Sequence, residues 1–473
     1  STGTNNFVAG NFALACNLTG SSNIAIGGEA LGRTCTGSSH VALGCRALYC
    51  TTSASFNVAI GYYALYHNVN FGGSIAIGCK AGCCALCGPN IMIGDASGMF
   101  LNGCHNILLG MGAGTNATEA TGNTLIGRLS GGCNTTGSKN VSVGWNAGYG
   151  NTTGSGNINV GRESGALSCG ATGSANISMG QFSGKCISSA QCNISIGECA
   201  ACCLSTGGCN VAIGKGAGKG YSSGSENVSI GNESGAQSGN DSGSGNITLG
   251  KAGQCISSGS NNIAMGSVNM TTGNVTGDAN ISMGPYTGRR LTSGGYNTFI
   301  GGSAGRYTTI GSRNVFIGIF AGYCNQSGGC NVAIGCNAGR GSSAAYDNIS
   351  MGRAALYLNE IGSGNVAIGH SASYGVRGSN NVSIGATAGP ANSCTDTHDN
   401  VFIGSRTGTA YTGGCNIIAI GINAGASSCC NQNLGSSAAF GCNNIHIGQN
   451  TGCKTQSGDN NITIGCRAGR NLT

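Results

Sequence analysis

The stretch Asn210-Val211-Ala212-Ile213-Gly214 recurs with small variations along the whole chain. Three further copies are Asn23-Ile24-Ala25-Ile26-Gly27, Asn57-Val58-Ala59-Ile60-Gly61 and Asn365-Val366-Ala367-Ile368-Gly369. The closing glycine occurs 27 times, most often at intervals of 17 residues, and stands at positions 10, 27, 44, 61, 78, 94, 110, 127, 144, 161, 180, 197, 214, 231, 250, 266, 284, 301, 318, 335, 352, 369, 385, 404, 421, 448 and 465. A repeat of this length predicts a stack of similar units, each of which contacts only its neighbours.

The residues just before this glycine have the alternation of a β-strand. Counting from the glycine as position 0, positions −1 and −3 are aliphatic in nearly every copy, and position −2 is usually Ala or Ser. A period of two is typical of a strand with one buried face. Position +3 is Ala, Ser or Thr in 25 of the 27 copies. We therefore expect a thin core that takes two aliphatic residues and one small residue from each repeat, with the small residue in a second, closely packed wall.

A unit of 17 residues cannot enclose a core alone, but stacked units can, because each strand pairs with its equivalents above and below. The sequence therefore predicts an all-β fold, a parallel β-solenoid or β-roll of about 27 coils. We expect one continuous solenoid domain over residues 1–473, with a loop insertion near 427–434, where one step lengthens to 27 residues. Position −4 is Asn in 24 copies, which predicts a ladder of side-chain amides along the stack.

The composition excludes several classes of protein. Gly accounts for 91 of 473 residues, charged residues for 7% and Pro for 3 residues, which disfavours helical, disordered and collagen-like chains. With 14 Asp plus Glu and 6 His, few groups are present for acid–base catalysis, so we expect neither an enzyme nor a cofactor. The net charge of +7 is dilute and no apolar run reaches 18 residues, so we expect no nucleic-acid partner and no membrane span. The chain starts at Ser1 without an apolar leader, and we expect a processed product.

The string Asn-Ile/Val-Ala-Ile-Gly-x-x-Ala-Gly, complete in Asn210 to Gly218, resembles the head repeats of trimeric autotransporter adhesins, the YadA-like heads. It is also similar to repeats of related fibre proteins. The resemblance covers nearly the whole chain. It implies a left-handed β-roll that usually assembles as a trimer.

The chain has 28 Cys, which would form a disulfide framework in an oxidising compartment. Equivalent positions on adjacent coils lie about 4.8 Å apart, within the Cα separation that a disulfide spans. Cys84-x-x-Cys87 and Cys199-x-x-Cys202 have zinc-like spacing, but neighbouring Cys are common in this composition, so we expect no metal site. Three pairs occupy equivalent positions and are the expected disulfides: Cys192–Cys209, Cys186–Cys203 and Cys415–Cys442.

Nineteen Asn-x-Ser/Thr sequons occur, and their positions in the repeat separate them into groups. Nine lie on the Asn ladder and should be bare: Asn140, Asn176, Asn193, Asn227, Asn246, Asn280, Asn348, Asn381 and Asn461. Eight others, at positions +6 to +9 in a loop along one edge, are the expected glycosylation sites: Asn17, Asn116, Asn134, Asn151, Asn240, Asn274, Asn325 and Asn471. Sequons together with dense Cys favour a secreted eukaryotic protein that is extracellular or at the cell surface.

We expect an extracellular structural protein that forms a disulfide-linked, N-glycosylated filament, hair or sheath. Its expected partners are N-linked glycans and further copies of itself, stacked head to tail because neither terminal coil carries an obvious cap over its strand edges. Small residues at position −2, such as Ala25 and Ser195, would also allow lateral packing. The alternative function is an adhesin or receptor-binding fibre shaft. An ice-binding array would need a row of Thr, but position −2 has Thr only at Thr248 and Thr463.

Overall fold

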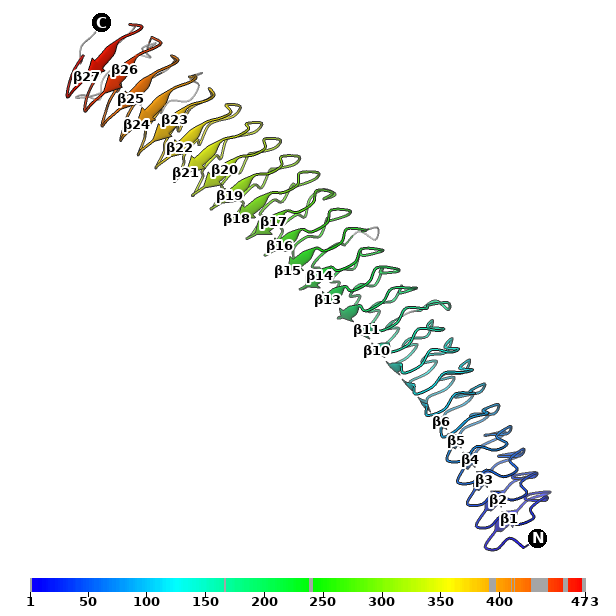
Figure 1. The fold of residues 1–473 in the computed structure, drawn as a ribbon. Coiled ribbons are helices and arrows are strands. Elements are labelled where there is room, and N and C mark those ends of the chain that lie inside the picture. Colours follow the sequence, from blue (N-terminus) through cyan, green and yellow to red (C-terminus); the bar gives the residue numbers. More distant parts are fainter. Residues whose placement is uncertain are drawn as a thin grey trace. The chain divides into compact units, whose positions relative to one another are not determined.

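The computed structural model describes residues 2–165, 167–237, 241–390, 397–409, 411, 413–426, 441–453 and 458–469. The chain divides into two compact units, unit 1 over residues 1–242 and unit 2 over residues 243–473. Each unit is an all-β, parallel β-solenoid in which every coil contributes one three-residue strand, and the described residues contain no helix (Figure 1). The solenoid fold expected from the repeat is thus confirmed. The insertion expected at 427–434 lies outside the described residues.

The fourteen strands of unit 1 each end one residue before a closing glycine. Pairing keeps equivalent positions opposite each other, so that Val211 pairs with Ile194 on one side and with Val228 on the other. The strands are β1 (Phe7–Ala9), β2 (Ile24–Ile26), β3 (Val41–Leu43), β4 (Val58–Ile60), β5 (Ile75–Ile77), β6 (Ile91–Ile93), β7 (Ile107–Leu109), β8 (Thr124–Ile126), β9 (Val141–Val143), β10 (Ile158–Val160), β11 (Ile177–Met179), β12 (Ile194–Ile196), β13 (Val211–Ile213) and β14 (Val228–Ile230).

Unit 2 repeats the same arrangement with thirteen strands. Its register is also preserved, as in the pairing of Val315 with Val332. The strands are β15 (Ile247–Leu249), β16 (Ile263–Met265), β17 (Ile281–Met283), β18 (Thr298–Ile300), β19 (Val315–Ile317), β20 (Val332–Ile334), β21 (Ile349–Met351), β22 (Val366–Ile368), β23 (Val382–Ile384), β24 (Val401–Ile403), β25 (Ile418–Ile420), β26 (Ile445–Ile447) and β27 (Ile462–Ile464).

The interior of each coil takes the central residue of the strand. In β13, Ala212 is buried, whereas Val211 and Ile213 are half exposed, and the central residue alone is buried in every strand from β2 to β27. The expectation that the aliphatic residues at −1 and −3 form the core is therefore wrong. Successive side chains of a strand point to opposite faces. Because the Asn at −4 is buried, the same alternation buries position −2 and turns −3 and −1 outward.

The remaining interior is filled mainly from positions +3, +4 and +7, and large residues compensate for small ones between −2 and +4. The small residue at +3 is buried as expected, as in Ala47 and Ala321. One coil combines Ala42 at −2 with Leu48 at +4, and both are fully buried. Another combines Phe316 at −2 with Gly322 at +4, and the phenyl ring occupies the space that a side chain on Gly322 would need. The volume of the interior is therefore shared between these two positions.

The closing glycine is required both by its backbone conformation and by its neighbour. Gly197 has a φ of +128°, which side chains disfavour. A Cβ atom on Gly197 would lie 2.5 Å from the carbonyl oxygen of Gly214 on the next coil. Successive coils therefore approach each other too closely along the glycine row to admit a side chain.

The Asn residues at −4 form the expected ladder inside the stack. The backbone N–H of Asn157 donates to Oδ1 of Asn140 at 2.9 Å, and Nδ2 of Asn140 donates to the carbonyl of Gly154 at 3.0 Å. In unit 2, Nδ2 of Asn297 also donates to Oδ1 of Asn280 at 3.0 Å. Each buried amide thus joins its own coil to its neighbours, which satisfies polar groups that no water reaches.

Candidate functional surfaces

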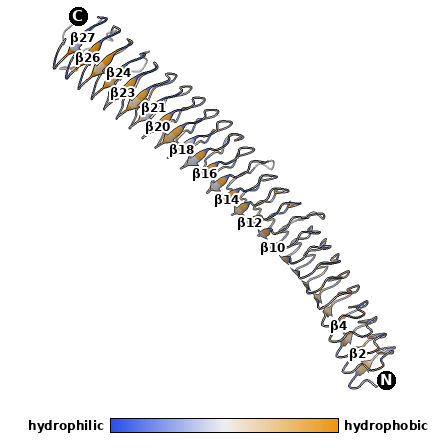
Figure 2. Ribbon diagram, in the orientation of Figure 1, coloured by the Kyte–Doolittle hydropathy of each residue, from blue (hydrophilic) through white to orange (hydrophobic). Residues whose placement is uncertain are grey.

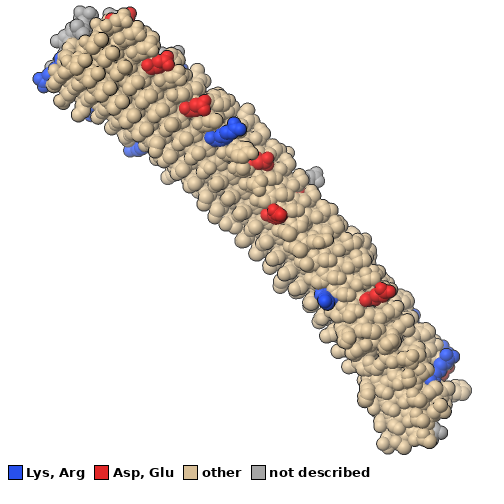
Figure 3. All heavy atoms as spheres, viewed as in Figure 1, with Lys and Arg blue, Asp and Glu red and all other residues tan. Residues whose placement is uncertain are grey.

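The outward residues of the strands form an aliphatic face on each unit. We define this face as the residues at −3 and −1 of β1–β14 in unit 1 and of β15–β27 in unit 2. None of them is charged, and Thr124 and Thr298 are the only ones with a polar side chain. Typical members remain well exposed, with Ile24, Ile26 and Ile247 each at 38%. Figure 2 shows the apolar colouring of the strands, and charged residues are sparse on the side seen in Figure 3.

The aliphatic face is much larger than the isolated apolar residues that any soluble protein exposes. Monomeric proteins rarely leave contiguous apolar patches above a few hundred Å² uncovered, and larger patches mark contact surfaces. The expectation that small residues at −2 mediate lateral packing is wrong, because Ala25 and Ser195 are fully buried and cannot touch a neighbouring molecule. The residues that a neighbour could touch are the aliphatic ones on either side of them.

Two cysteine pairs whose partners are both described are bonded, and the sequence analysis predicts neither of them. Cys87 and Cys104 lie on adjacent coils with their Cα atoms 5.3 Å apart. Cys133 and Cys169 are separated by 36 residues with Cα atoms 5.8 Å apart. The step from Gly161 to Gly180 has two residues more than the usual 17, and Cys169 lies in it, so an irregular step was the available signal. Cys87 belongs to a disulfide and therefore cannot ligate zinc through the Cys84-x-x-Cys87 motif.

The three cysteine pairs expected from the repeat are not bonded in the structure. Cys415 and Cys442 come nearest, with their Sγ atoms 2.7 Å apart. The other two pairs occupy equivalent positions flanking or near β12 and β13, whose strands pair in register. The pairings Cys186–Cys203, Cys192–Cys209 and Cys415–Cys442 therefore stay predictions.

Sequons of the loop group differ in accessibility. Asn116 and Asn274 are exposed, as a glycan would require, whereas Asn17 at position +7 is only half exposed and its Nδ2 donates to the carbonyl of Gly20 at 2.9 Å. The expected exposure is wrong for Asn134, Asn151 and Asn325, which are buried at position +7. Position +7 faces the interior, where Nδ2 of Asn134 donates to the carbonyl of Gly137 at 2.9 Å. Asn240 and Asn471 lie outside the described residues.

The ladder sequons are less accessible than Asn116 and Asn274. Asn461 is half buried, and the other eight ladder sequons are buried: Asn140, Asn176, Asn193, Asn227, Asn246, Asn280, Asn348 and Asn381.

Arginine and aromatic residues gather five and six positions after the closing glycine in unit 2. We call this set the Arg–Tyr strip and define it as Arg289, Arg290, Arg306, Tyr307, Tyr323, Arg340, Tyr357 and Tyr374. Its members contact each other from coil to coil: the guanidinium carbon of Arg290 lies 4.5 Å from the ring centre of Tyr307. Apart from the adjacent pairs Arg289-Arg290 and Arg306-Tyr307, these residues are 16 to 17 or more positions apart in the chain and become neighbours only when the coils stack.

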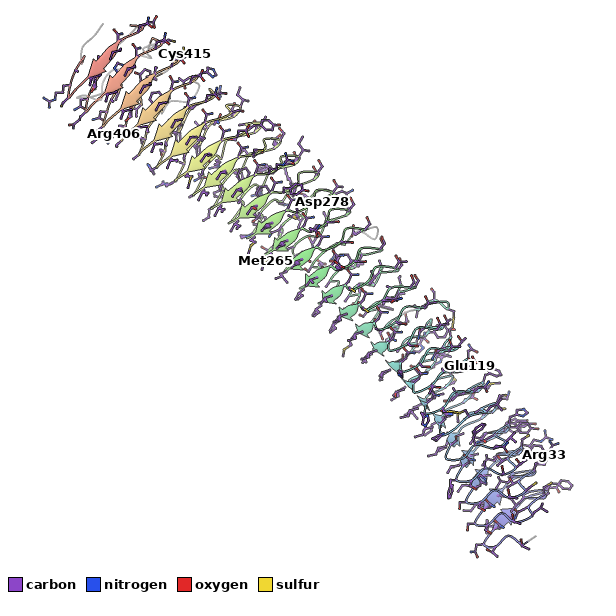
Figure 4. The ribbon with its side chains drawn as sticks, in the orientation of Figure 1. Arg33, Glu119, Met265, Asp278, Arg406 and Cys415 are labelled. Carbon is purple, nitrogen blue, oxygen red and sulfur yellow. A yellow bond between two sulfur atoms is a disulfide. The ribbon has the colours of Figure 1, made fainter. Side chains whose placement is uncertain are left out.

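A smaller cluster of the same kind occurs in unit 1. Arg33 lies over the ring of Tyr49 at 5.2 Å, and the rings of Tyr49 and Tyr66 stack at 5.3 Å. A hydrogen bond to Tyr49 is the main cause that raises the pKa of Arg33. Arg46 in the same cluster is neutralised by Glu29, with Nε 2.9 Å from Oε2. Figure 4 places Arg33 and Asp278 at the loop side of their coils and Met265 at the strand side.

Among the described residues, no group of three or more His, Cys, Asp or Glu side chains could hold a metal ion. Within the same part of the chain, no helix is long and apolar enough to cross a membrane. Comparisons with models of protein families, with curated proteins and with solved structures find no match for this chain. The surfaces described above therefore carry the functional argument.

Proposed function

We propose that the chain is a building block of an extracellular structural fibre, in which copies associate side by side through the aliphatic face. The observation that carries this proposal is the continuous, uncharged row of outward Ile, Val, Leu and Met side chains on each unit. Two disulfides and exposed sequons at Asn116 and Asn274 support a location outside the reducing cytosol.

The magnitude of the apolar effect favours association. Burying an aliphatic side chain completely contributes about 1.5–3 kcal/mol. Residues of the face are roughly a third exposed, so covering each one contributes about 0.5–1 kcal/mol. The fourteen strands of unit 1 carry 28 such positions, so covering all of them contributes about 14–28 kcal/mol, against the ~4–15 kcal/mol lost when two molecules associate. A second copy of the chain fits best as the occupant, because it offers the same uncharged face at the same coil spacing.

Head-to-tail stacking is a separate proposal that uses different groups. It would join strand edges through backbone hydrogen bonds and would leave the aliphatic face free for lateral contact. The alternative proposal of an adhesin or receptor-binding shaft uses the same solenoid but needs no lateral assembly. Substitutions on the aliphatic face should disrupt lateral association. They should leave head-to-tail stacking and an adhesin shaft unaffected, so they distinguish the first proposal from the other two.

The test places charges on the aliphatic face at β12 of unit 1. Ile194→Lys with Ile196→Lys should abolish lateral association, whereas Ser189→Lys with Thr206→Lys adds the same charge at exposed loop positions and should leave it unchanged. Sedimentation velocity gives the mass of the species, and electron microscopy shows whether bundles form. Circular dichroism checks that both variants stay folded. Bundles formed equally by the face variant would overturn the proposal, and single unbranched filaments would indicate head-to-tail stacking alone.

A further inference from the structure

We infer that the Arg–Tyr strip of unit 2 is a docking surface for a linear acidic polysaccharide that carries sulfate or uronate groups. This inference concerns a different surface and a different partner from the proposed self-association, and neither depends on the other. It stands on the charge of the strip, on the geometry of its aromatic rings and on the repetition of both along the stack.

The strip concentrates unneutralised positive charge. It contains four arginines on coils that close at Gly284, Gly301 and Gly335, and no Asp or Glu occupies position +5 or +6 anywhere in the chain. Arg46, Arg162, Lys215 and Arg377 each pair with a Glu, whereas no arginine of the strip forms an ion pair with a described residue. Guanidinium N–H groups that no carboxylate occupies are suited to bind sulfate or carboxylate oxygens.

The aromatic rings hold these arginines in place. The ring of Tyr323 lies between Arg306 at 5.9 Å and Arg340 at 5.3 Å. The ring of Tyr357 lies between Arg340 at 5.4 Å and Tyr374, whose ring is parallel to it at 4.9 Å. Arg340 also donates to the hydroxyl of Tyr357 at 2.8 Å. A side chain held in this way loses little further conformational freedom when it binds an anion.

The same geometry selects the class of partner. Proteins that bind single-stranded nucleic acid offer open aromatic faces on which bases stack. In the strip, the faces of Tyr323 and Tyr357 are covered by neighbouring guanidinium groups and by Tyr374, so no stacking platform is open there. The groups left to a partner are guanidinium N–H and phenol O–H donors. Such donors recognise sulfate, carboxylate and sugar hydroxyl groups without stacking.

The repetition of the strip fits a linear partner that runs along the stack. Arg290 and Arg306 lie on successive coils, and Arg340 lies two coils further on. Neighbouring coils are about 4.8 Å apart, so the charges form a row instead of a single pocket. A polymer with regularly spaced acidic groups can contact several arginines at once, which raises its affinity above that of a single anion.

Binding of the full chain to heparin, a linear sulfated and uronate-bearing glycan, tests the inference. The strip variant Arg290→Gln, Arg306→Gln, Arg340→Gln keeps side chains that cover the rings. The control variant Arg313→Gln, Arg353→Gln, Arg406→Gln removes the same charge from exposed arginines outside the strip. We expect the Kd for heparin to rise at least about tenfold in the strip variant and less than about twofold in the control variant.

Three results would overturn the inference: no binding of heparin by the wild-type chain, equal losses in both variants, or tighter binding of single-stranded oligothymidine through the same arginines. Uncharged dextran should not bind. If the strip variant folds poorly, arginine modification of the wild-type chain by phenylglyoxal replaces it. Heparin should then protect Arg290, Arg306 and Arg340 more than Arg313 and Arg406, and equal protection of both groups would contradict the inference.

Discussion

His40 occupies a position of the Asn ladder and reproduces the hydrogen bonds of the amide it replaces. Its backbone N–H donates to Oδ1 of Asn23 at 3.0 Å, its Nδ1 accepts the N–H of Asn57 at 3.2 Å, and its Nε2 contacts the carbonyl of Ala54 at 2.7 Å. This arrangement fits a neutral imidazole with the proton on Nε2, because a proton on Nδ1 would face the N–H of Asn57. Burial accordingly lowers the pKa of His40 below its usual value.

We predict that His40→Asn makes the protein less sensitive to acid. A lowered pKa in the folded state means that the unfolded chain binds the proton first, so stability falls as the pH drops below about 6.5. The loss amounts to about 1.4 kcal/mol for each pH unit between the unfolded and folded pKa values. Urea unfolding at about pH 7.5 and about pH 5 measures it. His105→Asn, on an exposed residue, is the control, and an unchanged pH dependence of His40→Asn would contradict the prediction.

We predict that Gly197→Ala destabilises the stack strongly. Its φ of +128° is a region used almost only by Gly, at a cost of about 1–3 kcal/mol for other residues. The new Cβ would also lie 2.5 Å from the carbonyl oxygen of Gly214, so the expected loss is at least about 3 kcal/mol. Gly28→Ala is the matched control, because no atom lies within 4 Å of its added Cβ. Similar unfolding midpoints for the two variants would show that the coils do not need the glycine row.

Within one coil, the strand and the segment after it share a fixed interior volume. Phe316 at −2 is buried over Gly322 and stacks on Phe299 with ring centres 5.3 Å apart. Ala42 at −2 is instead paired with Leu48 at +4. Leu48 adopts a φ of 52°, close to the φ of 56° at Gly322, so leucine is compatible with that backbone.

We predict that Phe316→Ala costs about 3–5 kcal/mol and that the second change Gly322→Leu restores a substantial part of it. The double variant recreates the Ala42–Leu48 combination, so the two changes should not be additive. Ile317→Ala, on the outward face of the same strand, should cost less than Phe316→Ala, since its side chain is already half exposed. Denaturant unfolding of the four variants, including Gly322→Leu alone, gives the coupling free energy between residues 316 and 322. Additive effects would show that positions −2 and +4 do not share one space.

The sequence predicted the element and its register but assigned the strand faces incorrectly. The closing glycine, the Asn ladder and the small residue at +3 each follow from a local rule, and all three are present. Aliphatic residues are usually buried, and this general rule points to the wrong side of the strand here. The correct side follows from alternation alone: Asn210 at −4 and Ala212 at −2 share a face, and a buried amide row places both inside. The Arg–Tyr strip could be found only by aligning position +5 between repeats.

At the scale of the whole molecule, cross-links add to a core built from few atoms per coil. Unit 1 holds the bonded pairs Cys87–Cys104 and Cys133–Cys169, and unit 2 brings the sulfur atoms of Cys415 and Cys442 to 2.7 Å. A disulfide that closes a loop of about 15 residues stabilises a fold by about 3 kcal/mol. Burial of Cys202 raises the pKa of its thiol to about 12. Because the thiolate is the reactive form, this thiol should react slowly in thiol–disulfide exchange.

We predict that peptide mapping of the oxidised protein finds Cys87–Cys104, Cys133–Cys169 and Cys415–Cys442. Cys415 and Cys442 are equivalent residues of consecutive coils, and their sulfur atoms need to move by less than 1 Å to form a bond of about 2.05 Å. Cys415→Ser should leave Cys442 open to alkylation without reductant, whereas neither residue should react in the wild-type chain.

Two other cysteines serve as controls for the alkylating reagent. Exposed Cys16 should react readily. Buried Cys202 should react slowly even after reduction, because its thiolate fraction is about a thousandfold below that of an ordinary thiol. Alkylation of both Cys415 and Cys442 in the oxidised wild-type chain would contradict the pairing and would weaken the case for an oxidising environment.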